Sequence, residues 1–216
     1  MNDYITSQEA KSLILEMGRR LYQKGFVAAN DGNISCMVGP NTLWTTPTGV
    51  SKGFMTEDML VKVDLEGNLL LQSGQPSSEL KMHLRVYREN PRVRCVVHAH
   101  PPVATAFAVA GLPLNQPILA EGVAQFGEIP VAPYATPGTQ EVPDAVAPFC
   151  NSHNGILLAN HGALTWDEEP MQAYLRMESL EHWATVTLYT RLLGQANPIP
   201  AEKLSALRAV RAARGN

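Results

Sequence analysis

Val96-Val97-His98-Ala99-His100-Pro101 places two histidines at the end of an apolar run. The pattern predicts a buried strand that stops at the proline. Successive side chains of a strand point to opposite faces of the sheet, so His98 and His100 point to the same face. Two imidazoles on one face are the first half of a metal site. The other half has to come from elsewhere in the chain.

The composition favours one globular domain over residues 1–216. A hydrophobic content of 45% in 216 residues suffices for a sizeable core, and a charged fraction of 17% argues against disorder. The net charge of -3 gives no electrostatic reason to expect a nucleic-acid partner. The 3 cysteines include no Cys-x-x-C pair, which argues against a disulfide framework and a thiolate zinc site.

The sequence favours a cytoplasmic protein that does not contact membranes. Residues 1–12 lack the basic and then apolar pattern of a signal peptide. The longest apolar region, 95–114, is broken by histidines and prolines, so it is not a membrane span. The cysteine usage also fits a reducing compartment.

Apolar periodicity and turn residues give a coarse map of the elements. We expect helices at 7–25 (with Ser7 as the N-cap), 79–90, 103–110, 142–149 and 202–214, and one long helix or a helix pair at 167–193. We expect a strand after the turn at 30–35, strands at 43–46, 93–99, 129–132 and 155–159, and two short strands around the turn 66–68. The segment 119–127 shows no period and is expected to be irregular.

Two further candidate ligands stand at the ends of expected elements. Pro76-Ser77-Ser78-Glu79 predicts a helix start in which a serine is the N-cap and Glu79 lies in the first turn. The apolar strand at 155–159 runs into Asn160-His161-Gly162, from which a histidine can project into a cleft. Ordinary structural roles compete with the functional ones. Glu79 would suit a helix-capping carboxylate, and the paired His98 and His100 can be core residues.

A set of three imidazoles and one carboxylate suits Zn²⁺ best, because nitrogen-rich tetrahedral sites favour this ion, although Mn²⁺ or Co²⁺ is compatible. The set is Glu79, His98, His100 and His161. With one exchangeable ligand the ion would act as a Lewis acid on a carbonyl or hydroxyl oxygen. Other families with a His-x-His motif fit poorly, because residues 101–105 contain no acidic residue and no further histidine.

Two loops could bind an anion. Asn30-Asp31-Gly32-Asn33 and Pro47-Thr48-Gly49 combine residues that permit positive φ with backbone N–H and hydroxyl donors. A plain hairpin turn is the competing interpretation of the first loop. Lys52 is the basic residue nearest to these loops.

The motifs occur together in one order, and that order resembles the class II aldolase/adducin family over residues 7–193. The motifs are Gly32-Asn33-Ile34-Ser35, Thr46-Pro47-Thr48-Gly49, Pro76-Ser77-Ser78-Glu79, His98-Ala99-His100, Ala132-Pro133-Tyr134 and Asn160-His161-Gly162. The resemblance implies a three-layer α/β/α fold around a largely antiparallel sheet. It also implies a homotetramer with its sites between neighbouring subunits.

The resemblance further implies roles for individual residues. Zn²⁺ would be held by His98, His100 and His161, with Glu79 as a fourth ligand that leaves to act as the general acid or base. A phosphate pocket would be lined by Gly32, Asn33, Thr48, Gly49, Ser77 and Ser78.

The implied reaction is the cleavage of a ketose 1-phosphate to dihydroxyacetone phosphate and an aldehyde through an enediolate. Epimerase-like members have aspartate at the position of Glu79, so Glu79 favours an aldolase. The tyrosine that aldolases of this family carry in the segment matching 119–127 is missing, and no tyrosine follows Tyr189. Glu121, Gln125 or Tyr134 could substitute as the second acid, or the aldehyde partner could differ.

Three alternatives stay open at this point. A metal-dependent decarboxylase or a sugar-phosphate epimerase could use the same scaffold. A non-catalytic interaction module, like the adducin head domain, is the alternative from another class. Retention of all four candidate ligands argues against the module.

Overall fold

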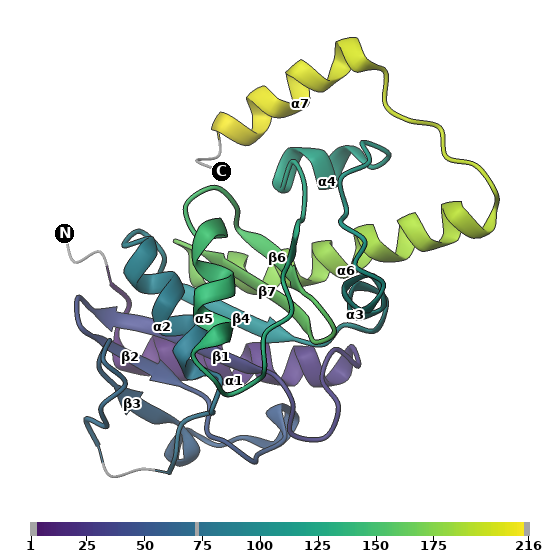
Figure 1. Ribbon diagram of the computed structural model, residues 1–216. Helices are drawn as coiled ribbons and strands as arrows, with labels where there is room; N and C mark the ends of the chain where they lie inside the picture. Colours follow the sequence, from purple (N-terminus) through teal and green to yellow (C-terminus); the bar gives the residue numbers. More distant parts are fainter. Residues whose placement is uncertain (1–3, 72–73, 214–216) are drawn as a thin grey trace.

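The computed structural model describes residues 4–71 and 74–213, which form a 7-stranded sheet between two layers of helices (Figure 1). The strand order is β3-β2-β1-β4-β7-β6-β5. The strand pairs are antiparallel except β5 with β6, which is parallel. The expected α/β/α architecture around a largely antiparallel sheet is confirmed.

The strands are β1 (Asn33–Gly39), β2 (Thr42–Thr45), β3 (Val61–Val63), β4 (Cys95–Ala99), β5 (Val131–Ala132), β6 (Gly155–Leu158) and β7 (Gly162–Asp167). The α-helices are α1 (Ser7–Gln23), α2 (Leu80–Glu89), α3 (Pro102–Val109), α4 (Ala120–Gln125), α5 (Glu141–Val146), α6 (Pro170–Leu192) and α7 (Ala201–Ala213). Short 3-10 turns are η1 (Lys52–Phe54), η2 (Glu57–Met59) and η3 (Ala147–Phe149).

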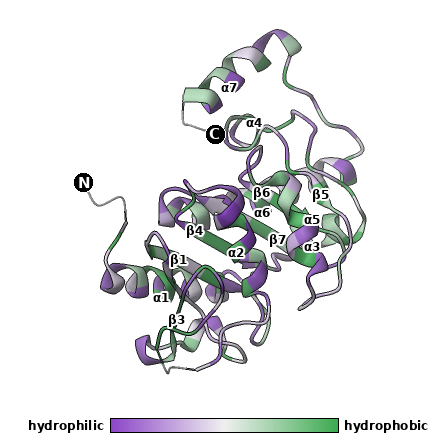
Figure 2. Ribbon diagram, turned by 60° about the vertical axis from the view of Figure 1, so that its left-hand side comes forward, coloured by the Kyte–Doolittle hydropathy of each residue, from purple (hydrophilic) through white to green (hydrophobic). Residues whose placement is uncertain are grey.

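The central strand β4 is buried on both faces, and its alternating side chains enter two separate cores. Val97 and Ala99 pack with α1, α3 and α6, whereas Val96 packs on the opposite face with α2 and α5. Figure 2 shows β4 and β7 as hydrophobic along most of their length. Full burial of a valine or leucine contributes about 1.5–3 kcal/mol, so both helical layers hold this strand in place.

Helix α1 is capped one residue earlier than the sequence suggests. The N-cap is Thr6 rather than Ser7: Thr6 Oγ1 accepts from the backbone N–H of Glu9 at 3.2 Å. The Glu9 carboxylate accepts from Thr6 N–H at 2.8 Å, which completes a capping box. Gly25, at φ 68°, follows the helix end as expected.

The start of α2 also differs from the expectation. Glu79 itself holds the cap position, and its side chain makes no capping hydrogen bond. Ser77 Oγ instead accepts from the Glu79 N–H at 3.3 Å. The carboxylate of Glu79 is therefore free of helix capping and can point elsewhere.

Three segments differ from the sequence expectations. Strand β7 is not predicted by the sequence, because only a short turn separates it from β6 and no Gly/Pro-rich loop marks its start. The segment 119–127 contains α4, which is too short to show a helical period. Of the two strands expected around 66–68, only β3 forms, with an isolated bridge between Val63 and Leu69.

The long helix expected at 167–193 is one helix, α6. Helix α7 packs beside α4, away from the sheet (Figure 1). Within 4–71 and 74–213, no helix combines the length and apolarity needed to cross a membrane.

Candidate metal centre

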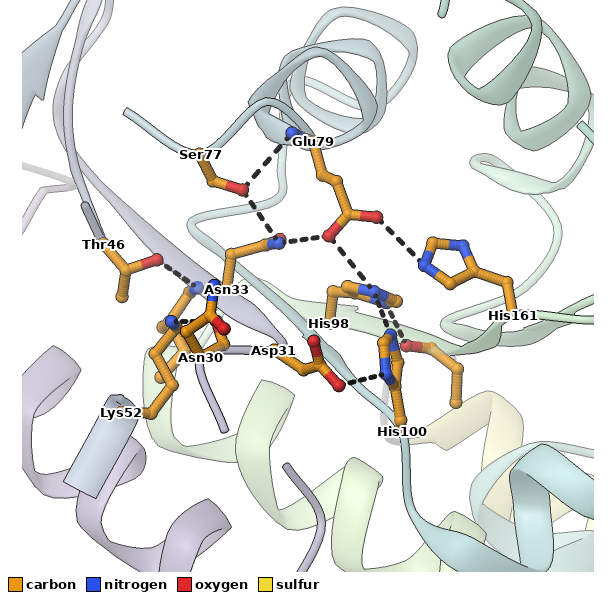
Figure 3. Close-up of polar contacts among 12 residues, drawn as sticks. Asn30, Asp31, Asn33, Thr46, Lys52, Ser77, Glu79, His98, His100 and His161 are labelled. Carbon is orange, nitrogen blue, oxygen red and sulfur yellow. Dashed lines mark hydrogen bonds and ion pairs between the residues drawn. The ribbon is translucent and has the colours of Figure 1, made fainter. Parts of the chain in front are cut away.

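Three histidines converge at one end of the β4–β7 pair (Figure 3). His98 lies on β4, His100 follows its last residue, and His161 lies in the turn that joins β6 to β7. Pairing of Ala99 with Ala163 places this turn beside the end of β4. The ring centroids of the three histidines are 4.7–5.0 Å apart. Their candidate ligand atoms all lie within 4.8 Å of one another.

The turn closes on the histidines because its backbone adopts unusual conformations. Asn160 has φ 57°, in the left-handed region that asparagine tolerates better than most residues. A Cβ on Gly162 would lie 2.5 Å from Cδ2 of His100 and 2.7 Å from the carbonyl oxygen of Ala99. Only glycine at 162 allows this approach, so the sequence Asn160-His161-Gly162 is itself part of the site.

Two of the rings are oriented through their Nδ1 atoms. His98 Nδ1 donates to the carbonyl oxygen of Ala163 at 2.8 Å, and His100 Nδ1 lies 3.4 Å from Oδ2 of Asp31. Each Nε2 is then a lone-pair donor, as in metal sites where an outer partner fixes the histidine tautomer. The two Nε2 atoms lie 3.0 Å apart. Two lone pairs at this distance repel, and a cation coordinated by both relieves the repulsion, so the donor set fits a metal ion.

Glu79 faces the histidines from the start of α2. Its Oε1 lies 2.9 Å from His161 Nε2, and its Oε2 lies 3.5 Å from His98 Nε2. Asn33 Nδ2 donates to Glu79 Oε2 at 2.8 Å, and also to Ser77 Oγ at 3.2 Å. The amide of Asn33 thus holds the carboxylate toward the rings.

The protonation of the cluster follows from its burial. Burial lowers the pKa of His98 to about 3, against an opposing effect of Glu79, and it also lowers the pKa of His100. Both rings are neutral at pH 7, which is the form that binds a metal. Burial alone would raise the pKa of Glu79, but the interactions with His98 and His161 outweigh it and hold the pKa well below its usual range. Glu79 is a carboxylate at neutral pH.

Three members of the cluster, Glu79, His100 and His161, form one wall of a cavity of about 220 Å³, and His98 is fully buried beside them. The other walls come from the loops around Gly32 and Gly49, which have φ of 74° and 72°. Of the residues predicted for a phosphate pocket, all line this cavity except Asn33, whose side chain is buried behind Glu79; the lining members are Gly32, Thr48, Gly49, Ser77 and Ser78.

The predicted second acids lie outside this cavity in their own chain. Glu121 is on α4 and lines a separate hollow with Lys24 and His182. Tyr134 follows β5 and is 63% exposed. Within the described part of the same chain, neither Glu121 nor Tyr134 therefore lines the cavity beside the histidines. His83 of α2 is fully buried outside this cavity and contacts Ser35 Oγ at 2.8 Å through Nδ1.

Two cavity residues receive no functional assignment from the sequence. The sequence indicates only a turn position for Asp31, yet its carboxylate contacts His100. Lys52, which the sequence marks only as a nearby basic residue, is 1% exposed and lines the cavity. Burial lowers the pKa of Lys52 to about 8. The motif context of the two loops is the signal that could have drawn attention to both.

Comparisons with known proteins agree with this geometry. A model of the class II aldolase and adducin N-terminal domain matches residues 12–188. A 3-oxo-tetronate 4-phosphate decarboxylase of Haemophilus influenzae is 32% identical over 195 residues, covering 88% of this chain and 91% of the relative. An L-fuculose phosphate aldolase of Methanococcus vannielii is 36% identical over 166 residues, covering 76% and 87%.

Similar solved structures carry names from the same range. YgbL of Klebsiella pneumoniae, described as a putative aldolase/epimerase/decarboxylase, superimposes with a TM-score of 0.87 at 28% identity, covering 94% of this chain and 99% of YgbL. An L-fuculose 1-phosphate aldolase superimposes with a TM-score of 0.86 at 26% identity, covering 96% and 97%.

Proposed function

The chain belongs to the family of class II aldolases and adducin N-terminal domains, and we propose that it is a metal-dependent carbon–carbon lyase that forms dihydroxyacetone phosphate. The observation that supports this most is the convergence of three histidine rings and one carboxylate beside a polar cavity, which Glu79, His100 and His161 line. His98, His100 and His161 would hold the ion, with Zn²⁺ favoured by the nitrogen-rich set and Mn²⁺ or Co²⁺ as substitutes.

The ion and the carboxylate would divide the chemistry between them. A divalent ion bound here supplies a Lewis acid that polarises the ketone of the substrate. Glu79, which lies against the histidine Nε2 atoms, is ionised at neutral pH and would first take up a proton from solvent. It would then pass that proton to the carbanion next to the ketone, which completes the product. Asn33 keeps the carboxylate in place through its 2.8 Å hydrogen bond.

Two reactions lead to the same carbanion. Loss of CO₂ from a 3-oxo-tetronate 4-phosphate leaves the enediolate of dihydroxyacetone phosphate. Cleavage of C3–C4 in a ketose 1-phosphate leaves the same enediolate and an aldehyde. The two differ in what departs: CO₂ leaves without a proton transfer, whereas formation of the aldehyde requires a second group to take the proton of the C4 hydroxyl.

Decarboxylation is the better match to the described cavity. Its carboxylates are Glu79 and Asp31, and Asp31 lies at the Nδ1 side of His100, away from the Nε2 atoms. Glu79 alone faces the converging nitrogens, and Glu121 and Tyr134 line no part of this cavity. One proton-transfer group suffices for decarboxylation, and relatives at 31–32% identity carry the name of such an enzyme.

Aldol cleavage is the second candidate, because other relatives are named L-fuculose phosphate aldolases. Its missing group would come from a neighbouring subunit. Large apolar side chains stand exposed at the end of α6 and on α3: Tyr189 (59%), Leu192 (75%), Leu193 (79%) and Val109 (56%). A surface of this kind is typical of subunit contacts, and we propose a homotetramer.

The test supplies the zinc-loaded protein with 3-oxo-tetronate 4-phosphate made in situ, and separately with a panel of ketose 1-phosphates. We expect CO₂ and dihydroxyacetone phosphate in equal amounts from the first, abolished by a chelator and restored by the ion. A higher kcat/KM with a ketose 1-phosphate, with aldehyde release, would select the aldolase instead. No turnover of either class by the metal-loaded protein would favour an interaction module.

A further inference from the structure

We propose that Lys52 binds the phosphate group of the substrate and sets the preference for phosphorylated over unphosphorylated compounds. This inference rests on the proposed function only in taking the ligand to be a phosphate ester. Its basis is a buried cation on the cavity wall that lacks an anionic partner in the described chain.

The ammonium of Lys52 is held by backbone carbonyls rather than by carboxylates. Its Nζ donates to the carbonyl oxygen of Asn30 at 2.9 Å and to that of Val50 at 2.6 Å. An ammonium has three N–H donors, so one remains for another acceptor. Across residues 4–71 and 74–213, no carboxylate lies within ion-pair distance of this nitrogen.

Burial of such a charge costs free energy. The residue is 1% exposed, and an ionised group removed from water without a partner is strongly disfavoured. Glu79 and Asp31 are the nearest compensating charges, but each lies against a histidine ring. The protein's own groups therefore balance the charge only in part, and an anionic ligand would complete the balance.

The position of Lys52 matches a phosphate rather than the chelated ketone. It lines the same cavity as Gly32, Thr48, Gly49 and Ser77. The loops that contain these residues offer backbone and hydroxyl donors. Figure 3 shows Lys52 beside Asn30, on the side of the site away from His161. A phosphate ester carries up to two negative charges and three acceptor oxygens, and a lysine serves it as a point charge.

The backbone around Lys52 is packed too tightly to move with the ligand. A Cβ on Gly18 of α1 would lie 2.7 Å from the carbonyl oxygen of Lys52, and a Cβ on Gly53 would lie 2.5 Å from the ring of Tyr22. Helix α1 thus fixes η1 from behind. A cation held on a rigid support is already oriented before an anion arrives.

The test measures anion binding directly, so that it does not depend on turnover. Inorganic phosphate and dihydroxyacetone phosphate are titrated by calorimetry into wild type, Lys52→Met, Lys52→Arg and the control Lys62→Met. Lys62 lies on β3, outside the cavity. We expect Lys52→Met to weaken both affinities about 10- to 100-fold, the range of a hydrogen bond to a charged group. Lys52→Arg should retain part of the affinity, and Lys62→Met all of it.

A second readout separates binding from a purely structural role. If Lys52 only joined the segments around Asn30 and Val50, its removal would weaken the binding of unphosphorylated and phosphorylated ketones alike. The metal content would fall too. We expect the loss to be confined to phosphorylated ligands, with metal content unchanged. Equal loss for both classes, or unchanged phosphate affinity in Lys52→Met, would overturn the proposal.

A further variant and a comparison of outcomes keep the result decisive. If Lys52→Met does not fold, Lys52→Gln keeps an uncharged NH₂ group with two donors for the carbonyl oxygens and should show the same loss of phosphate affinity. If phosphate binding depends on Lys52 but neither lyase reaction is found, the proposal for Lys52 stands and the proposed function fails. Lyase activity on a phosphorylated substrate that is insensitive to Lys52 would do the reverse: the proposed function would stand, and the role of Lys52 would be refuted.

Discussion

Strands β4 and β7 carry a polar cluster at each end, and the two clusters differ in how far their members satisfy one another. The far end is the one opposite the histidines, where β7 ends at Asp167. There, Nε and Nη2 of Arg176 both lie 2.6 Å from Oδ2 of Asp167, and Nη1 donates to the carbonyl oxygen of Gln125 at 3.2 Å. At the near end, two imidazole nitrogens face each other at 3.0 Å. The first cluster is complete in itself, and the second is complete only with a cation.

Cavity size ranks these two ends in the opposite order. The cavity beside Asp167 and Arg176 measures about 710 Å³, and the one beside the histidines about 220 Å³. The largest pocket is the usual default for a binding site. Here the converging lone pairs of the histidines identify the site better than volume does, because Arg176 and Asp167 already neutralise each other beside the larger cavity.

The largest effect is expected from His100→Ala. Its ring lies at the cavity wall and is partly exposed, so its loss should leave the fold intact while removing one of three nitrogen ligands. We expect metal affinity to fall by more than about 100-fold, the upper range for losing an outer-shell partner, and lyase activity to fall with it. Metal analysis after dialysis measures this; full metal content in the variant would remove His100 from the ligand set.

Glu79→Gln tests the carboxylate apart from the rings. The amide keeps the shape of the side chain but cannot move a proton, so kcat should fall about 10²- to 10⁴-fold. Metal content should stay near stoichiometric, because the three histidines remain. Steady-state kinetics with matched metal analysis checks this, and wild-type activity in the variant would exclude Glu79 as the proton-transfer group.

Asp167→Ala perturbs the complete cluster instead. The side chains of Arg176 and Asp167 are only 7% and 15% exposed, and removing one member of a buried pair costs about 3–5 kcal/mol of unfolding free energy. Urea unfolding measures the loss. Metal content and activity of the folded fraction should not change; a loss of metal without a loss of stability would contradict the division between the two ends.

Because His83 is buried, the unfolding free energy of the metal-free protein should depend on pH. Burial lowers its pKa to about 3 in the folded state, from 6.5 in the unfolded chain. Between these values the unfolded chain binds more protons, so the stabilising difference is present above pH 6.5 and is lost as the pH falls toward 3. Relative to wild type, His83→Gln should lower the slope of unfolding free energy against pH by up to about 1.4 kcal/mol per pH unit. Identical slopes from pH 4 to 6 would show that His83 does not contribute.

The smallest effect is expected from Arg92→Ala, which also lies at the far end. Arg92 pairs with Glu168 at 3.1 Å, but both side chains are more than half exposed, at 64% and 57%. Pairs of this kind contribute about 0–1 kcal/mol. Urea unfolding should therefore hardly separate the variant from wild type. A loss of unfolding free energy comparable to that of Asp167→Ala would mean that the exposed Arg92–Glu168 pair belongs energetically to the cluster of Asp167 and Arg176.

Local patterns in the sequence predict the centre of the site. The alternation around His98 and His100 indicates their shared face, and the ends of expected elements single out Glu79 and His161. These inferences need only the period of a strand and the start of a helix. The outer partners cannot be found in this way: Asp31 meets His100, and the carbonyl of Ala163 meets His98, through pairing between distant segments.

The same limit explains the errors in the fold. Strand β7 escapes prediction because a turn of three residues, 159–161, separates it from β6, and the sequence alone marks no boundary there. The short helix α4 has too few residues for a period to appear. The sequence leaves a capping role open for Glu79, and only the structure shows that Ser77 contacts the helix start and leaves the carboxylate free.

The spacing of the histidines along the chain has a consequence for how the protein reaches its native state. His98 and His161 are brought together by β4–β7 pairing, which joins residues more than 60 positions apart. Loops of this length close late, because their entropy is lost before contacts form. A metal ion held by these histidines would therefore not nucleate folding as it does in a zinc finger. Metal capture instead reports that the central sheet has assembled, and an ion probe added during refolding would time that event.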